Sequence, residues 1–296
     1  MNFLFNHIGF EPQANKVALI EAPADQLEGK AFTVYDAQTR HAVFRGAVAA
    51  RGMVAKWKGW HFWAADLSAL QQTGEFFIVI DDVHPPLVSH TFKIANELFA
   101  GQMLSDLVHY IKGQRCTGLY DMADQSRPLW DSEQRRDVSG AWYDASGDCS
   151  KYLSHLSYAQ FMNPQQTPQV VWNLIEGHAH IPQQLKWFDE RMIDEALHGA
   201  DFLVRMQDPA GFFYMTVFDQ WSKDENRRDI CEYKTQKGEK FASYQSAYRQ
   251  GAGSAIAALA RASQLSRDGE SFTRADYLLA ASRGFAHLEQ HNTEYL

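Results

Sequence analysis

The sequence predicts a two-domain protein, in which an all-β sandwich is followed by an all-α domain. The chain has 296 residues, enough for about two domains of ordinary size. Its hydrophobic pattern changes near residue 95, from short runs rich in β-branched and aromatic residues to stripes with helical spacing. Hydrophobic residues make up 45% and charged residues 22%, which is typical of a globular chain with a buried core. We therefore place the domains at residues 1–95 and 96–296.

The first domain is predicted to be a small immunoglobulin-like sandwich, because about seven strand-like runs occur with little helical signal. Asp81-Asp82 and Pro85-Pro86 form turns before a last strand that runs through Phe92. The clearest other strands are Lys16–Ile20, Ala31–Asp36, His41–Arg45 and Glu75–Ile80.

The second domain is predicted to contain about six helices. The first starts at the N-cap Asn96, and another starts at Thr167 with Pro168 in its first turn. We expect a further helix over Ser150–Met162 and an extended segment over Gly211–Phe218. The stripes expected to face the core are Met103, Leu107 and Tyr110; Val170, Val171, Leu174 and Ile175; Leu185, Phe188, Met192, Ala196, Ala200 and Leu203; Ala252, Ala255, Ile256 and Leu259; and Leu278, Ala281, Phe285 and Leu288.

Composition excludes several classes of partner. A net charge of −8 argues against nucleic acid or an anionic membrane surface, since both select basic faces. No stretch approaches the roughly 18 apolar residues of a membrane span.

Three widely spaced cysteines form no disulfide framework, and the N-terminus lacks the features of a signal peptide, so we expect a cytoplasmic protein. His178 and His180 have the spacing of metal ligands but no evident third ligand, so we expect neither metal nor cofactor.

The candidate chemistry lies in the long connection from Thr117 to Cys149. Asp144 and Asp148 are separated by small residues that allow a tight loop, so their carboxylates can converge. Converging carboxylates are tolerated where they hold a cation, a water or a developing positive charge, and activation of a water for attack on an acetal carbon is one such task. The alternative is structural, with one aspartate capping a helix and the other in a turn.

The run Val138–Tyr152 resembles the signature of glycoside hydrolase family 9, a Gly-Trp-Tyr/His-Asp-Ala-Gly-Asp stretch that leads into a Lys-Tyr pair. The first domain is similar to the immunoglobulin-like domain that often precedes this family's catalytic barrel. Ser146 is an insertion in the signature, as in a subgroup of bacterial members associated with the breakdown of glucosaminyl or chito-oligosaccharides. The further segments that match are Asn6–Phe10 with Lys16, Asp66–Ser68 with Gly74–Phe76, Gln114–Cys116 with Gly118, and Ala200–Gln207.

This resemblance implies an (α/α)6 toroid for the second domain and inverting hydrolysis of a β-glycosidic bond. Asp148 matches the general base that deprotonates water, and Asp144 matches the aspartate that orients this water. The family's general acid is a glutamate in a region without a counterpart here, and Glu176, Glu232 and Glu239 do not lie in its motif. We therefore expect the front part of a longer enzyme, with about half of the toroid's helices.

Further residues are candidates for contact with substrate. Trp142 and Tyr143 flank the aspartates and can stack on a sugar ring, or else pack within the loop. Tyr248 and Arg249 begin a helix at the end of the barrel where substrate is expected. The thiol of Cys149 is expected to be passive, although Lys151 and His155 lie near it in sequence, and the charged run Lys223–Asp229 is expected to be solvated.

The expected function is therefore hydrolysis of β-1,4-linked oligosaccharides, either glucosaminyl or cello-oligosaccharides, by trimming of short chains. Two alternatives stay open. One is an endo-β-1,4-glucanase of the same family, and the other is a sugar-binding remnant without turnover, because the acid is not identified. The expected partner is an oligosaccharide, and the oligomeric state is left open.

Overall fold

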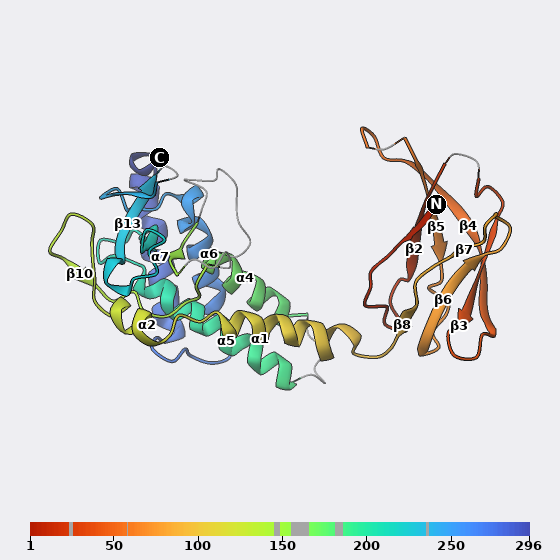
Figure 1. Cartoon of the computed structure of the whole chain (residues 1–296). Coiled ribbons are helices and arrows are strands. Elements are labelled where there is room, and N and C mark those ends of the chain that lie inside the picture. The colour runs from red at the N-terminus through yellow and green to blue at the C-terminus, as the bar shows by residue number, and fades with distance from the viewer. Residues whose placement is uncertain (24–25, 58, 145–148, 155–165, 181–185, 235–236) are drawn as a thin grey trace. The chain divides into compact units, whose positions relative to one another are not determined.

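The computed structural model describes residues 1–296 except 24–25, 58, 145–148, 155–165, 181–185 and 235–236. The chain divides into two compact units, Met1–Ser105 and Asp106–Leu296 (Figure 1). Each unit is described by itself. Among the described residues, no helix combines the length and the apolar character that a membrane crossing requires.

Unit 1 is the predicted β domain. Its strands follow the order β1-β2-β5-β4-β3-β6-β7, and β8 pairs with β6. The strand β4 is much longer than the predicted run His41–Arg45, and it pairs with β3 through its first half and with β5 through its second half. It thereby joins the two layers of the sandwich. The strands are β1 (Asn2–Leu4), β2 (Val17–Ala22), β3 (Ala31–Asp36), β4 (Ala42–Met53), β5 (His61–Asp66), β6 (Gly74–Ile80), β7 (Leu87–Val88) and β8 (Phe92–Ile94).

Alternation along the strands fills the core of unit 1. On β2, for example, Ala18, Ile20 and Ala22 point inward and are fully buried. The ammonium of Lys16, at the entrance to β2, is buried too, and it donates to the carbonyl oxygens of Pro12 at 2.7 Å and Ala14 at 2.9 Å. These two bonds satisfy a cation that burial would otherwise disfavour.

Unit 2 contains six α-helices and a four-stranded sheet of order β11-β12-β13-β14 among its described residues. The helices are α1 (Ser105–Gly113, whose first residue ends unit 1), α2 (Gly118–Asp124), α4 (Thr167–His178), α5 (Lys186–Arg205), α6 (Ala252–Ala262) and α7 (Arg274–His291). A π-helical turn over Phe99–Leu104, in unit 1, precedes α1. The strands are β9 (Arg127–Pro128), β10 (Arg135–Arg136), β11 (Lys151–Tyr152), β12 (Thr216–Phe218), β13 (Asp229–Lys234) and β14 (Glu239–Phe241). Short 3-10 turns are η3 (Glu225–Arg227), η4 (Tyr248–Gln250) and η5 (Asn292–Tyr295).

Two predictions about the backbone of unit 2 were wrong. The helix expected from Ser150 does not start there, because Lys151 and Tyr152 pair with β12 as the strand β11; residues 155–165 lie outside the described residues. The helix α2 occupies part of the expected long loop. Its seven residues are too few to show a hydrophobic period, so the pattern could not reveal it.

Helix α5 forms the centre of the helical packing, against α4, α6 and α7 (Figure 1). Its predicted stripe is buried from Phe188 to Leu203, and Leu185, the first residue of that stripe, lies outside the described residues. The stripe predicted for α7 was only half correct, because Ala281 and Leu288 are buried but Leu278 and Phe285 are 54% and 51% exposed. On the α1 stripe, Met103, Leu107 and Tyr110 are exposed as well. Small residues, including Ala280, Ala281 and Gly284, form much of the buried face of α7.

Candidate active site

The signature segment is held by a short antiparallel pairing with the residues before α2. The amide of Cys116 donates to the carbonyl of Ala141 at 2.8 Å, and the amide of Tyr143 donates to the carbonyl of Gln114 at 2.9 Å. Arg115 and Trp142 face each other in this pairing as an isolated bridge. The two sequence segments that resembled the family separately are therefore neighbours in space.

The described residues on either side of 145–148 are hydrogen-bonded to each other. The amide of Asp144 donates to the carbonyl of Ser150 at 3.2 Å, so the two ends of the loop meet. Ser150 is anchored further, because its hydroxyl donates to Oδ1 of Asp219 at 2.8 Å and accepts from the Asp219 amide at 3.1 Å. Asp144 is half-buried. The predicted base Asp148 falls between these ends and lies outside the described residues.

The side chain of Trp142 anchors the signature segment to helix α5. Its side chain is only 6% exposed, and its indole nitrogen donates to Oε1 of Glu195 at 2.6 Å. Glu195 is itself buried and accepts from Arg115, with Nη2 and Oε2 2.7 Å apart. The indole also fills the space above Gly199, where an added Cβ would stand 2.4 Å from it. This burial argues against the predicted stacking of Trp142 on a sugar ring.

Tyr143 is half-buried, and its hydroxyl donates to the carbonyl of Thr117 at 3.3 Å. Its ring lies edge-on to that of Tyr120, with centroids 5.8 Å apart. Burial raises the pKa of Tyr143, and burial together with a hydrogen bond to Cys149 raises the pKa of Tyr120 to about 12. Both phenols therefore stay neutral at physiological pH and act as hydrogen-bonding groups.

Tyr248 and Arg249 lie on η4. The hydroxyl of Tyr248 donates to Glu289 at 3.0 Å, while Arg249 is exposed. Gly251, at the end of this turn, has a φ of +114° and approaches the chain that follows β11, because an added Cβ would stand 2.8 Å from the carbonyl oxygen of Leu153. The segment that holds Tyr248 and Arg249 thus passes beside residues that continue from the signature.

Sequence reasoning missed a buried charged cluster beside the signature, formed by Asp124, Lys151 and Arg228. Arg228 belongs to the run Lys223–Asp229 that was expected to be solvated, and this expectation was wrong for Arg228, which has 0% exposure. The ammonium of Lys151 lies 2.7 Å from Oδ2 of Asp124. The Lys151 ammonium is therefore held by the Asp124 carboxylate, and the passive thiol at Cys149 stays a prediction.

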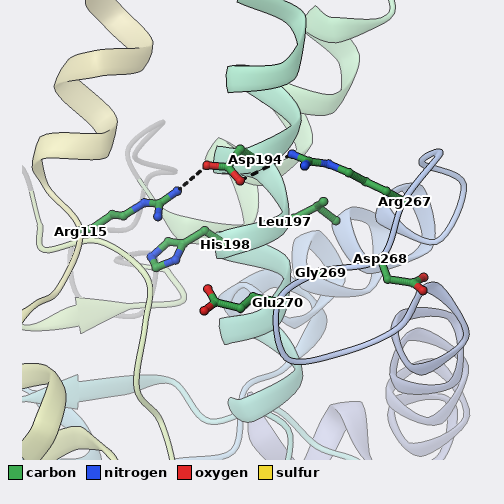
Figure 2. Close-up of a pocket in the computed structure, with 8 residues that line it drawn as sticks. All are labelled: Arg115, Asp194, Leu197, His198, Arg267, Asp268, Gly269 and Glu270. Carbon is green, nitrogen blue, oxygen red and sulfur yellow. Dashed lines mark ion pairs between the residues drawn. The ribbon is translucent and has the colours of Figure 1, made fainter.

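A pocket of about 290 Å³ lies between Arg115, the α5 residues Asp194, Leu197 and His198, and the segment Arg267–Glu270, and it was not anticipated (Figure 2). In it, Asp194 of α5 lies between the guanidinium groups of Arg115 and Arg267, each 3.5 Å away. His198 lines the same pocket, and its Nε2 donates to the carbonyl of Ala141 at 3.2 Å. Burial, and then the charge of Arg115, lowers the pKa of His198, so this imidazole is neutral near pH 7.

The remaining candidates are engaged in other contacts. His178 is paired with Asp189, and within the described ranges no three ligating side chains gather as a metal site would require. Glu176 is paired with Arg261 on α6, and Glu232 contacts Lys234 at 3.2 Å and Ser243. Glu239 lies on the short strand β14 and is exposed. His155 lies outside the described residues.

Comparison with known families accounts for both units. A model of the cellulase N-terminal Ig-like domain matches residues 2–85, and a model of glycosyl hydrolase family 9 matches residues 100–295. No curated protein sequence matches the chain.

Solved structures share the fold of the whole chain. A metagenome-derived glycoside hydrolase family 9 endoglucanase superposes with a TM-score of 0.68 at 20% identity, covering 98% of this chain and 54% of its own. A GH9 protein of Bacteroides ovatus gives 0.63 at 19% identity, with coverages of 98% and 54%. The GH family 9 endoglucanase J30 gives 0.61 at 21% identity, with coverages of 95% and 53%. The chain therefore spans about half the length of these structures.

Proposed function

Because the matching model covers well over half of its residues, the chain belongs to glycosyl hydrolase family 9, and we propose that it acts in the inverting hydrolysis of β-1,4-glycosidic bonds in oligosaccharides. The observation that carries this proposal is the hydrogen bond from the amide of Asp144 to the carbonyl of Ser150. Because this bond brings Asp144 next to Ser150, it supports the proposal that Asp144 and Asp148 act on one water molecule.

In the proposed reaction, Asp148 removes a proton from a water that Asp144 orients, and this water attacks the anomeric carbon. A carboxylic acid on the other side of the sugar protonates the leaving oxygen. In an inverting enzyme these carboxyl groups stand about 6.5–9.5 Å apart, so that the water fits between base and sugar. Glu176 is committed to its ion pair with Arg261 and is a poor candidate for this acid.

We propose a glucosaminyl or glucosyl oligosaccharide as substrate. The net charge of −8 favours a cationic glucosamine unit. Action on internal bonds of a β-1,4-glucan is the second candidate, because two of the similar solved structures are described as endoglucanases. The three cysteines are free thiols, which suits a reducing compartment and supports the cytoplasm as the proposed location.

The test compares sugar release by the whole chain and by matched variants, with cello-oligosaccharides and glucosamine oligomers as substrates. We expect Asp148→Asn and Asp144→Asn to lose at least about 10²-fold in kcat, because each removes a carboxylate from the attacking water. Asp131→Asn is the control, since Asp131 is exposed in a turn with a φ of +60° that asparagine also adopts. Equal activity in all three variants would refute the assignment, and sugar binding without turnover by the unaltered chain would favour a binding role.

A further inference from the structure

The cluster of Asp124, Lys151 and Arg228 joins three distant parts of unit 2. Asp124 ends α2, Lys151 begins β11, and Arg228 directly precedes β13. Oδ2 of Asp124 lies 2.7 Å from Nζ of Lys151 and 2.7 Å from Nη2 of Arg228, while its Oδ1 accepts from Nε of Arg228 at 2.7 Å. The aspartate therefore holds an ammonium and a forked guanidinium at once, and all three side chains have 0% exposure.

Both cations also hold the backbone of the signature segment, at its two ends. Nζ of Lys151 donates to the carbonyls of Val138 at 2.5 Å and Gly140 at 3.0 Å. Nη1 of Arg228 donates to the carbonyl of Cys149. The backbone of Asp124 takes part as well, since its carbonyl accepts from the amide of Val138 at 2.9 Å. One cluster thus holds the backbone at Gly140 and at Cys149.

We infer that Asp124, Lys151 and Arg228 are positioning residues, which clamp the two ends of the segment between Gly140 and Cys149 so that its aspartates meet the water. This inference rests on the proposed hydrolysis. Stability alone does not require these charges, because a buried ion pair can often be replaced by apolar side chains without loss of stability. An apolar side chain cannot donate to the carbonyls of Val138, Gly140 and Cys149, however, and these bonds define where the segment begins and ends.

The charge balance of the cluster fits this role. Burial alone would raise the pKa of Asp124, but the opposing charges and hydrogen bonds of Lys151 and Arg228 outweigh it, and the pKa is lowered. Burial likewise disfavours the charged form of Arg228, and its contacts with Asp124 raise the pKa overall. The carboxylate of Asp124 and the guanidinium of Arg228 therefore both stay charged at neutral pH.

The first test is Lys151→Met, with Lys16→Met as the matched control. Each substitution removes a buried ammonium that donates to two backbone carbonyls, but Lys16 belongs to unit 1. We expect amide hydrogen exchange across residues 138–154 to rise at least about tenfold in Lys151→Met and to stay unchanged in Lys16→Met. In hydrolysis, we expect kcat per folded molecule to fall about 10²-fold with little change in KM, because Lys151 is fully buried and cannot itself contact the sugar, whereas the aspartates are misplaced.

Arg228→Lys serves as the second variant, in case Lys151→Met does not fold. A lysine keeps a positive charge beside Asp124, but its single ammonium cannot contact both carboxylate oxygens of Asp124 and the carbonyl of Cys149 at once. We expect a folded protein with faster exchange around Cys149 and a lowered kcat. Wild-type exchange across residues 138–154 in either folded variant, or a wild-type kcat per folded molecule, would overturn the inference. If the unaltered chain hydrolyses no saccharide, the proposed function fails, while hydrogen exchange still decides whether the clamp exists.

Discussion

The indole nitrogen of Trp142 donates a 2.6 Å hydrogen bond to Oε1 of Glu195, a carboxylate that is 1% exposed and also paired with Arg115. This contact ties the signature segment to the middle of α5, the central helix of unit 2. A buried polar contact therefore anchors the backbone two residues before Asp144. Such contacts specify one arrangement, because breaking them leaves a buried charge less well satisfied.

Replacement of Trp142 by phenylalanine is expected to destabilise unit 2 by about 1–3 kcal/mol, because Glu195 loses one hydrogen bond in a buried site. Trp187→Phe is the control, since Trp187 lies on the same helix as Glu195 but is 44% exposed. Scanning calorimetry of the unit 2 transition measures the difference. Sugar affinity should change no more in Trp142→Phe than in the control, and a loss specific to Trp142 would show that its ring contacts the sugar.

Gly199→Ala is expected to destabilise the same unit by about 1–3 kcal/mol through overpacking. A Cβ at this position would stand 2.4 Å from both the Trp142 ring and Val171. At Gly113, near the end of α1, an added Cβ meets nothing within 4 Å, so Gly113→Ala should be neutral or stabilising by up to about 1 kcal/mol. Thermal unfolding distinguishes the two, and equal shifts would mean that the contact between α5 and Trp142 is loose.

His198 is expected to make the stability of unit 2 depend on pH. Burial and the charge of Arg115 lower the pKa of His198 in the folded state, whereas its pKa in the unfolded chain is about 6.5. Below pH ~6.5 the imidazole of His198 takes up a proton in the unfolded chain but stays neutral in the folded one. The neutral imidazole therefore contributes its full stabilisation above pH ~6.5, and the unfolding free energy declines as the pH falls towards the lower pKa of the folded state.

His198→Gln keeps a donor for the carbonyl of Ala141 but does not titrate, so it should flatten this decline. The measurement is the unfolding free energy at pH 7.5 and at pH 5.5, two values chosen to lie either side of about 6.5. His287, whose pKa burial also lowers, is present in both proteins and cancels in the comparison. An equal decline in the wild type and in His198→Gln would exclude His198 as its source.

Local patterns were enough to predict the β domain and the buried stripe of α5, because alternation and helical spacing report directly on one buried face. They were also enough to single out Asp144 as a loop residue of interest. The same patterns misplaced Leu278 and Phe285, since a periodic stripe does not tell which of two apolar faces on a helix is covered.

The contacts that hold the site could not be predicted in this way. Asp124 and Arg228 are 104 positions apart, and Arg228 lies in a charged run that was expected to be solvated. The choice between sugar stacking and loop packing stayed open for Trp142, because nothing near it in sequence reveals Glu195, 53 positions away. Only the folded chain shows which of many charged and aromatic residues meet, since a pairing over such distances leaves no local period.

The central claim is inverting hydrolysis that depends on Asp148, and the anomer released first by the chain tests it most directly. Proton NMR of the reaction with a β-1,4-linked oligosaccharide follows the α and β anomers before they interconvert. We predict that the α-anomer forms first, and that Asp148→Asn releases neither anomer while Asp131→Asn behaves as the wild type. First release of the β-anomer, or undiminished release by Asp148→Asn, would contradict the claim.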